Sequence, residues 1–411
     1  MNTDSALAKD FTETFGAVSD IGRDPSGGYL RFAWTDEDRV ARAWFAEEAA
    51  SRGLAYERDR NGNLWAWWGD PTQGDALVLG SHLDTVPRGG AYDGALGVVS
   101  GLVAISAARE AGAEPRRPVA VAAFAEEEGG RFGVPTLGSG LLTGALHPDD
   151  VTNRRETSGG TLGQAMRSDA LATGEIGEDK DLLSRLGAYA ELHVEQGRAL
   201  VDVGAPLGLG TSIWPHGRWR LHLAGELNHA GTTTLDDRKD PMIVLARAIL
   251  TARERAGQLG AVATIGRVMA DPNNTNSVAE SVDAWLDARA SNDIALDELV
   301  ESVRVDTRLV GARGGVATEV ISESRSPEVD FDIGLSSRLK ETLRGRGLPA
   351  PDLAIAAGHD AGNFANLVPT AMLFVRNPTG ASHCPGEYAS DTDCVLGCAV
   401  LTDFVIDWVR G

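Results

Sequence analysis

Histidine and carboxylate side chains gather in one short stretch near residue 80. The apolar run 76–79 is typical of a buried strand, and His82, Asp84 and Asp93 follow it among several glycines. Metals and ligands collect at strand ends in α/β folds because the loops there can aim side chains into a crevice. The glycines on either side of Asp93 allow a tight turn that brings it back beside His82. Imidazole and carboxylate together bind divalent transition metals, so this stretch predicts the first half of a metal site.

A run of three glutamates supplies the next candidates. Glu126, Glu127 and Glu128 directly follow the apolar run 118–124, which predicts a second buried strand. Neighbouring side chains can converge at a strand end, where the backbone turns. One glutamate can then bind a metal while the next acts as general base on water. A solvated acidic turn is the alternative reading of three glutamates alone, and the strand before them favours function.

Two histidines near later strand ends extend the set. His193 lies within the apolar segment 189–194, and His383 follows the segment 370–375. The candidate ligands are therefore His82, Asp93, Glu128, His193 and His383. Such a carboxylate-rich set suits zinc, manganese or a related ion, and a bridging carboxylate can hold two ions about 3.5–4 Å apart. Asp84 is expected to hydrogen-bond the second ring nitrogen of His82.

Composition excludes several classes of protein. Lys and Arg total 38 against 59 Asp and Glu, and the formal net charge of -21 argues against nucleic acid as a partner. The three cysteines form no CxxC pair, which favours a reducing cytoplasm over a disulfide framework. No apolar run approaches the roughly 18 residues that span a membrane, and the first residues do not resemble a signal peptide.

The elements that must position these residues follow two styles. Up to residue 211 strands alternate with helices, which predicts an α/β fold with a mixed central sheet and helices on both faces. From residue 212 half-exposed alternating strands appear, as in Arg218 to Ala224, and they predict a smaller α+β domain with one open face. We therefore expect a catalytic domain over 1–211 and 326–411, with a dimerisation or lid domain inserted over 212–325.

The ordered motifs resemble one enzyme family. They are GSHLDTV with GG-x-YDG, EEEG-x-RF, ELH-x-EQG, NHAGTT, PNNTNSV with a later DAR, AGHDA and SH-x-P-x-EY, and they run from Gly80 to Tyr388. Together they resemble the hydantoinase/carbamoylase family of amidohydrolases, relatives of aminoacylases and carboxypeptidase-type metallopeptidases. The resemblance implies two divalent ions, zinc or manganese. One would be held by His82 and His193 and the other by Glu128 and His383, with Asp93 as the bridge.

The resemblance also implies roles for residues that bind no metal. Glu127 would be the general base and later the proton donor to the leaving nitrogen. His229 would reach in from the partner subunit of a homodimer formed through the inserted domain and polarise the scissile carbonyl. Gln196, Asn276 and Arg289 would clamp the substrate carboxylate, and His359 would lie near the site. Taken alone, His229 fits a capped loop histidine equally well, and Arg289 could pair with Asp287 or Glu280.

The expected reaction is hydrolysis of a C–N bond in a small ureido acid, either allantoate or an N-carbamoyl-L-amino acid, with release of ammonia and carbon dioxide. Action on N-acyl amino acids as an aminoacylase, deformylase or dipeptidase is the alternative, and a catalytically dead binding protein is a third. The chain departs from the family pattern at Thr234, where proline is common, and at Cys384, where serine is usual. Cys384 has no dedicated base and is not expected to be a nucleophile. The bulky segment 214–216 is expected to shape the substrate pocket.

Overall fold

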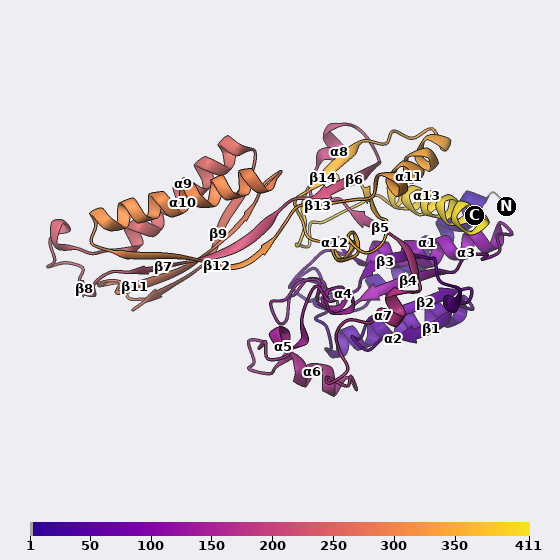
Figure 1. Ribbon diagram of the computed structural model, residues 1–411, viewed down its shortest axis with the longest axis horizontal. Coiled ribbons are helices and arrows are strands. Elements are labelled where there is room, and N and C mark those ends of the chain that lie inside the picture. Colours follow the sequence, from indigo (N-terminus) through magenta and orange to yellow (C-terminus); the bar gives the residue numbers. More distant parts are fainter. Residues whose placement is uncertain (1–2) are drawn as a thin grey trace. The chain divides into compact units, whose positions relative to one another are not determined.

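The computed structural model describes residues 3–411 and divides the chain into two compact units (Figure 1). The larger unit runs to Thr211 and resumes over Asp330–Leu353 and Gly358–Gly411. The smaller unit comprises Ser212–Val329 and Ala354–Ala357. The sequence prediction that the larger domain resumes at residue 326 is wrong by a few residues. Strand β12 (Ala317–Ser326) pairs with β7 (His216–Ala224) of the smaller unit to its last residue, so the chain leaves that unit only afterwards.

The larger unit is built on a nine-stranded mixed sheet in the order β1-β2-β4-β3-β5-β15-β6-β13, with β14 beside β6. Its strands are β1 (Ala55–Arg58), β2 (Leu64–Trp68), β3 (Ala76–His82), β4 (Val119–Phe124), β5 (Leu186–Val194), β6 (Leu207–Ile213), β13 (Val329–Asp330), β14 (Asp352–Ile355) and β15 (Thr370–Val375). The four central strands β4, β3, β5 and β15 are parallel to one another. Their carboxyl ends therefore lie along one edge of the sheet.

Helices cover both faces of this sheet, as the sequence predicts. Side chains such as Leu77 and Leu79 share a core with α1, α2, α3, α11 and α13, while Tyr189 faces the other way and stacks against Phe364 of α12. Helix α3 is buried along almost its whole length, which explains its apolar, alanine-rich sequence. The helices of this unit are α1 (Thr3–Ser19), α2 (Asp36–Ser51), α3 (Ala95–Glu110), α4 (Leu137–Thr143), α5 (Pro148–Val151), α6 (Leu162–Ser168), α7 (Lys180–Leu183), α8 (Ala199–Asp202), α11 (Ile333–Gly345), α12 (Asp360–Phe364) and α13 (Asp391–Arg410), with a 3-10 turn at Pro71–Gln73.

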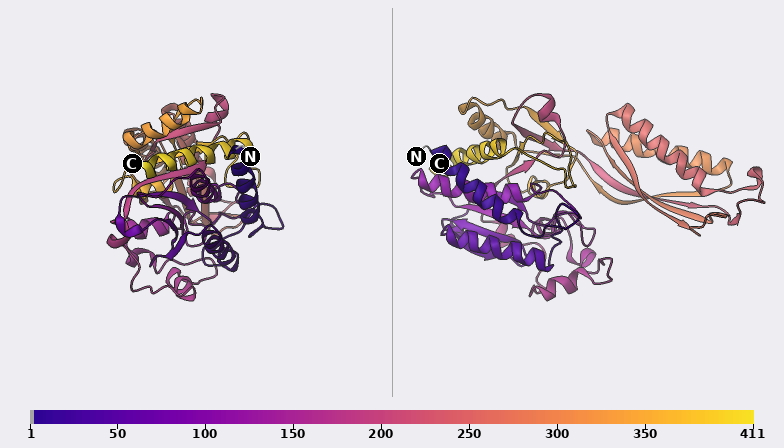
Figure 2. Two further views of the ribbon diagram at one scale, coloured as in Figure 1. Left: turned by 90° about the vertical axis from the view of Figure 1, so that its right-hand side faces the viewer. Right: turned by 180° about the vertical axis from the view of Figure 1, so that it is seen from behind.

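The smaller unit is a four-stranded antiparallel sheet in the order β12-β7-β11-β9, covered on one face by two long helices (Figure 2). Its elements are β7 (His216–Ala224), β9 (Val262–Asp271), β11 (Ser281–Arg289), β12, α9 (Pro241–Leu259) and α10 (Asp293–Arg313), with a 3-10 turn at Leu235–Asp237. Trp219, Leu221 and Leu223 alternate into the core, so the residues between them point to the open face. A short ribbon pairs β8 (Asn228–His229) with β10 (Ser277–Val278).

Among the described residues, no helix is long and apolar enough to cross a membrane.

Candidate metal centre

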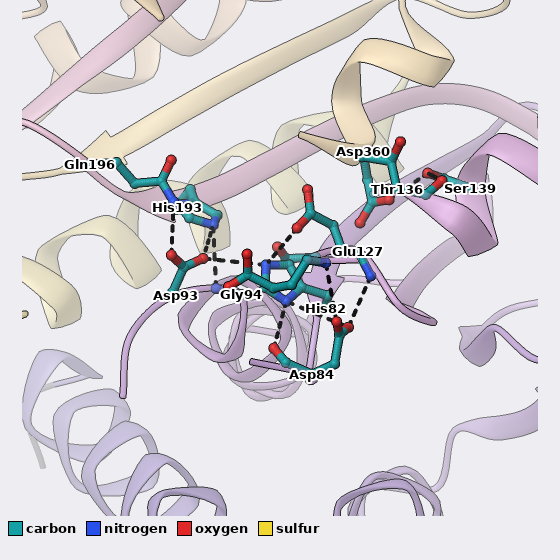
Figure 3. A network of polar contacts seen from close by, with 12 residues as sticks. His82, Asp84, Asp93, Gly94, Glu127, Thr136, Ser139, His193, Gln196 and Asp360 are labelled. Atoms are coloured by element: carbon teal, nitrogen blue, oxygen red, sulfur yellow. Dashed lines mark hydrogen bonds and ion pairs between the residues drawn. The ribbon is translucent and has the colours of Figure 1, made fainter. Parts of the chain in front are cut away.

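The parallel strands of the larger unit bring the candidate ligands to one edge of the sheet. His82 is the last residue of β3, His193 is the last but one of β5, and Glu127 follows β4 by three residues. Asp93 lies just before α3, and His383 lies in the segment after β15. In Figure 3 the side chains of His82, Asp93, Glu127 and His193 converge on one small volume. Asp93 and His383, 290 positions apart in the sequence, thus meet at the edge where the neighbouring parallel strands end.

The five predicted ligands form two donor groups that share Asp93. His82 Nε2 and His193 Nε2 lie 3.3 and 3.1 Å from Asp93 Oδ1. His383 Nε2 lies 3.5 Å from Asp93 Oδ2 and 3.4 Å from Glu128 Oε2. Within each group the potential ligand atoms all lie within 4.8 Å of one another, as a bound ion requires. Asp93 therefore offers one carboxylate oxygen to each group, which is the arrangement of a bridging ligand.

The ring tautomers of two histidines fit metal binding. His82 Nδ1 is 2.9 Å from the carbonyl oxygen of Asp84, and His193 Nδ1 is 2.9 Å from that of Val194. A carbonyl only accepts, so each Nδ1 carries the proton and each Nε2 has a lone pair in the neutral ring. The lone pair of His193 Nε2 accepts the Gly94 N–H at 3.3 Å. His82 Nε2 is buried and makes no hydrogen bond of good geometry within the described part of the chain. The donor set of imidazole nitrogens and carboxylate oxygens fits divalent ions such as zinc or manganese.

The pKa values of the buried histidines and glutamates show that the centre favours bound positive charge. Burial lowers the pKa of His193, but Asp93 outweighs this effect and raises that pKa to about 9. The pKa of His82 is likewise lowered by burial and raised well above its usual range by Glu127 and other carboxylates. Burial and neighbouring carboxylates raise the pKa of Glu127 and of Glu128. Buried carboxylates outnumber imidazoles here, and protons or divalent cations must compensate them.

Gly94 gives the Asp93 turn its shape. Its φ of 72° and ψ of -55° put it at the centre of a three-residue turn in which the Ala95 N–H donates to the Asp93 carbonyl at 2.9 Å. This positive-φ γ-turn is strained for L-residues but accessible to glycine. A Cβ at Gly94 would also lie 2.5 Å from the imidazole of His82. Glycine at this position lets the turn pass directly beneath a predicted metal ligand.

The carboxylate of Asp84 does not hydrogen-bond His82, although the spacing of the two residues predicts that contact. Its backbone carbonyl contacts His82 Nδ1, whereas its carboxylate oxygen Oδ1 is 3.8 Å away. The carboxylate instead accepts the backbone N–H groups of Glu127 and Glu128, each at 3.1 Å. Spacing along the chain could not reveal this because the partners come from the end of a neighbouring strand. Asp84 therefore holds the turn that carries the predicted base.

The three consecutive glutamates separate into different environments. Glu127 Oε2 lies 3.5 Å from His82 Nε2, beside the first donor group, while Glu128 belongs to the second. Glu126 has a φ of 54°, and its Oε1 accepts the backbone N–H groups of Arg131 and Phe132. Its role in the structure is to hold the following loop.

Two other predicted site residues lie around the donor groups. Gln196 Nε2 donates to Asp93 Oδ2 at 2.8 Å. This predicted substrate-binding residue therefore contacts the carboxylate that the two donor groups share. The His359 ring packs edge-on against that of His193, with the centroids 4.5 Å apart. Burial and the nearby His193 hold the pKa of His359 well below its usual range. His359 is therefore a neutral imidazole behind the centre.

The remaining predicted residues lie in the smaller unit. His229 and Asn276 are neighbours, since the Ala230 N–H donates to the Asn276 carbonyl at 3.0 Å. His229 Nδ1 accepts the N–H groups of Gly231 and Thr232 at 2.9 and 3.1 Å, so Nε2 of this exposed ring carries the proton. His229 therefore has the geometry of a capped loop histidine, which is the alternative that the sequence analysis left open.

Arg289 also forms a contact that the sequence left open. Its Nε donates to Asp287 Oδ1 at 2.9 Å, and its Nη1 donates to the Ala356 carbonyl at 2.8 Å. His216 lies opposite Arg289 on the neighbouring strand and hydrogen-bonds the Trp214 carbonyl at 3.0 Å. The bulky 214–216 segment is thus adjacent to the predicted carboxylate-binding arginine within the smaller unit.

Sequence reasoning missed one residue at the centre. Glu387 is buried, and its Oε1 accepts the backbone N–H groups of Tyr92 and Asp93 at 3.2 and 3.0 Å. The motif SH-x-P-x-EY contains this glutamate, and its place four residues after the predicted ligand His383 was the available signal.

Comparisons with known proteins find relatives that match most of this chain. Residues 78–407 match the model of Peptidase family M20/M25/M40. The chain is 32% identical to an N-carbamoyl-L-amino acid amidohydrolase of Geobacillus stearothermophilus, over 96% of this chain and 97% of that one. It is 31% identical to an allantoate amidohydrolase of Bacillus subtilis, over 97% of each chain.

A solved structure extends the likeness to the fold. The crystal structure of a hydantoinase/carbamoylase family amidase from Burkholderia vietnamiensis has a TM-score of 0.89 and 27% identity, over 98% of both chains. The alignments thus include both units and every segment that carries a donor group. The chain therefore belongs to Peptidase family M20/M25/M40, as a hydantoinase/carbamoylase-type amidase that hydrolyses amide C–N bonds.

Proposed function

We propose that this hydrolase uses two divalent ions, zinc or manganese, to cleave a C–N bond of a small ureido acid. Allantoate and N-carbamoyl-L-amino acids are the proposed substrates, with ammonia and carbon dioxide as products. The observation that carries the proposal is the pair of donor groups that share Asp93, with Glu127 beside them. The names of the relatives, an N-carbamoyl-L-amino acid amidohydrolase and an allantoate amidohydrolase, support this substrate class.

The residues divide between holding the ions and moving protons. His82 and His193 would hold one ion and Glu128 and His383 the other, with Asp93 shared. Bound divalent ions would acidify a water molecule and polarise the scissile carbonyl.

Glu127 is the proposed proton carrier. It is buried, and burial with the nearby Asp360 and Glu128 raises its pKa well above the usual range. Such a carboxylate accepts a proton from water more readily than an exposed one, and it can return that proton to the leaving nitrogen. Asp84 keeps it in place by holding the backbone N–H of Glu127 itself.

The smaller unit carries the groups proposed to bind the substrate. Because Nδ1 of His229 accepts two backbone N–H groups, its Nε2–H is available to donate to a carbonyl oxygen. Asp287 and the Ala356 carbonyl fix the guanidinium of Arg289, which lowers the entropy lost when it binds a carboxylate. Asn276, beside His229, would add an amide donor.

A homodimer through the smaller unit is part of the proposal. Exposed apolar side chains occur on helix α9, including Ile243 and Leu250, and on the edge strand β9, including Val262 and Met269. Large exposed apolar groups and an unpaired strand edge are features of a surface that associates with another chain. In such a dimer His229 would act in the site of the partner.

The test is a substrate panel with metal-loaded protein. Allantoate, N-carbamoyl-L-amino acids and β-ureidopropionate are assayed for ammonia, and formyl- and acetyl-amino acids for free amine. Metal-dependent ammonia release that is lost in Glu127→Gln supports the proposal. Turnover of acyl substrates alone makes the enzyme an aminoacylase or deformylase. No turnover by protein with two bound ions contradicts the proposed ureido substrate, and failure to bind metal favours a catalytically dead binding protein.

A further inference from the structure

Glu387 links the two segments that carry Asp93 and His383. It lies four residues after His383, in the segment between β15 and α13. Its carboxylate crosses to the turn before α3, where Oε1 accepts the N–H groups of Tyr92 and Asp93. A Cβ at Gly90 would overlap this carboxylate, so the glycine at this position leaves the space that Glu387 fills.

The two linked segments differ in how firmly they are held. The Asp93 turn continues into α3, which is buried, and its own backbone bonds include Leu96 N–H to the Tyr92 carbonyl at 3.0 Å. His82 and His193 are likewise buried at strand ends. The side chain of His383 is 50% exposed, and its residue has a φ of 55°. Its position depends on a loop outside the sheet.

Besides His383 itself, whose Nε2 lies 3.5 Å from Asp93 Oδ2, the side chains of Tyr388 and Glu387 contact the Asp93 turn. Tyr388 packs edge-on against Tyr92, with the ring centroids 6.0 Å apart. Glu387 supplies a carboxylate oxygen that accepts the backbone N–H of the shared ligand itself. Hydrogen bonds such as Asn377 Nδ2 to the Ala381 carbonyl at 2.7 Å lie within the loop. Gln196 Nε2, which donates to Asp93 Oδ2, also lies 3.4 Å from His383 Nε2, but it belongs to the segment after β5 and contacts only side chains of the two linked segments.

We propose that Glu387 is a positioning residue that holds the His383 half of the metal centre against Asp93. The inference rests on the proposed dinuclear function. Loss of the carboxylate leaves Asp93, His82 and His193 supported by α3 and the sheet, and it releases the loop that carries His383. The variant should therefore lose affinity for one ion and not for both. Residues that orient metal ligands typically alter metal affinity by about 10–100-fold when replaced.

The experiment is calorimetric titration of the metal-free full-length protein with manganese. For the wild type two binding events are expected. Glu387→Ala should keep one event near its wild-type affinity and weaken the other at least about tenfold. Glu387→Gln, which retains an oxygen at the same reach, should recover much of this affinity. Glu387→Asp withdraws the carboxylate by one carbon and should weaken the same event, which provides a second variant if Glu387→Ala does not fold.

Asp59→Ala is the matched control for a general loss of stability. Asp59 is also a buried carboxylate that accepts two backbone N–H groups, those of Asn61 and Asn63 at 2.9 Å. It should lower the unfolding temperature and leave both binding events unchanged. A Glu387→Ala protein that keeps both affinities, or loses both equally, overturns the inference. A wild type that binds fewer than two ions overturns the dinuclear proposal and this inference with it.

Discussion

Replacement of Gly94 by alanine tests whether the Asp93 turn positions the metal ligands. The substitution meets two obstacles: the γ-turn conformation, with φ of 72° and ψ of -55°, and the imidazole of His82, 2.5 Å from the new Cβ. A side chain in a sparsely populated backbone region costs about 1–3 kcal/mol. Overpacking in a buried site costs about 1–3 kcal/mol more. The free energy of unfolding should therefore fall by about 2–6 kcal/mol unless the His82 ring moves.

Gly112 provides the matched control at the other end of helix α3. Its φ is 76°, and a Cβ there would have nothing within 4 Å. Gly112→Ala should therefore cost only the backbone term, about 1–2 kcal/mol. It should leave metal binding unchanged, because no ligand contacts that position.

Two measurements decide the outcome. Urea denaturation of the metal-free proteins gives the change in unfolding free energy, and metal analysis after dialysis gives the ions retained. Gly94→Ala should retain less metal than Gly112→Ala, because the new methyl group displaces His82 from the group it forms with Asp93 and His193. If both variants bind the wild-type amount of metal with equal affinity, the reasoning from the turn to the ligand geometry is refuted.

Three further outcomes follow from the site. Glu127→Gln should lower kcat by about 10²–10⁴-fold with metal content unchanged, and a variant that keeps its rate would exclude Glu127 as the base. In metal-free protein, burial lowers the pKa of His193 but Asp93 raises it from 6.5 to about 9, so this group stabilises the fold fully below pH 6.5. That stabilisation is lost as pH rises through about 9, whereas metal-loaded protein should lack this loss because the ion requires a neutral ring; urea midpoints at several pH values measure both. Arg289→Lys should raise KM for a carboxylate substrate by about tenfold with little change in kcat, and an unchanged KM would remove Arg289 from the substrate clamp.

The sequence alone determined the parts of the site that follow from local patterns. Apolar runs mark buried strands, and polar residues that follow them must lie at strand ends, so His82, Glu127 and His193 could be placed at the edge of an α/β sheet. The change to alternating strands likewise predicted a second domain after residue 211. Such inferences can be drawn because strand and helix periodicity is encoded within a few consecutive residues.

Only the tertiary structure decided which groups the supporting side chains contact. Asp84 has the spacing to reach His82, yet its carboxylate holds the turn after β4, and Gln196 lies against Asp93. Glu387 reaches a turn almost 300 residues earlier in the chain. These partners are backbone N–H groups and side chains brought together by loops, and their conformation depends on the packing of the whole unit. A backbone donor has no residue type that a sequence pattern can signal, so such contacts become visible only when the strands are assembled.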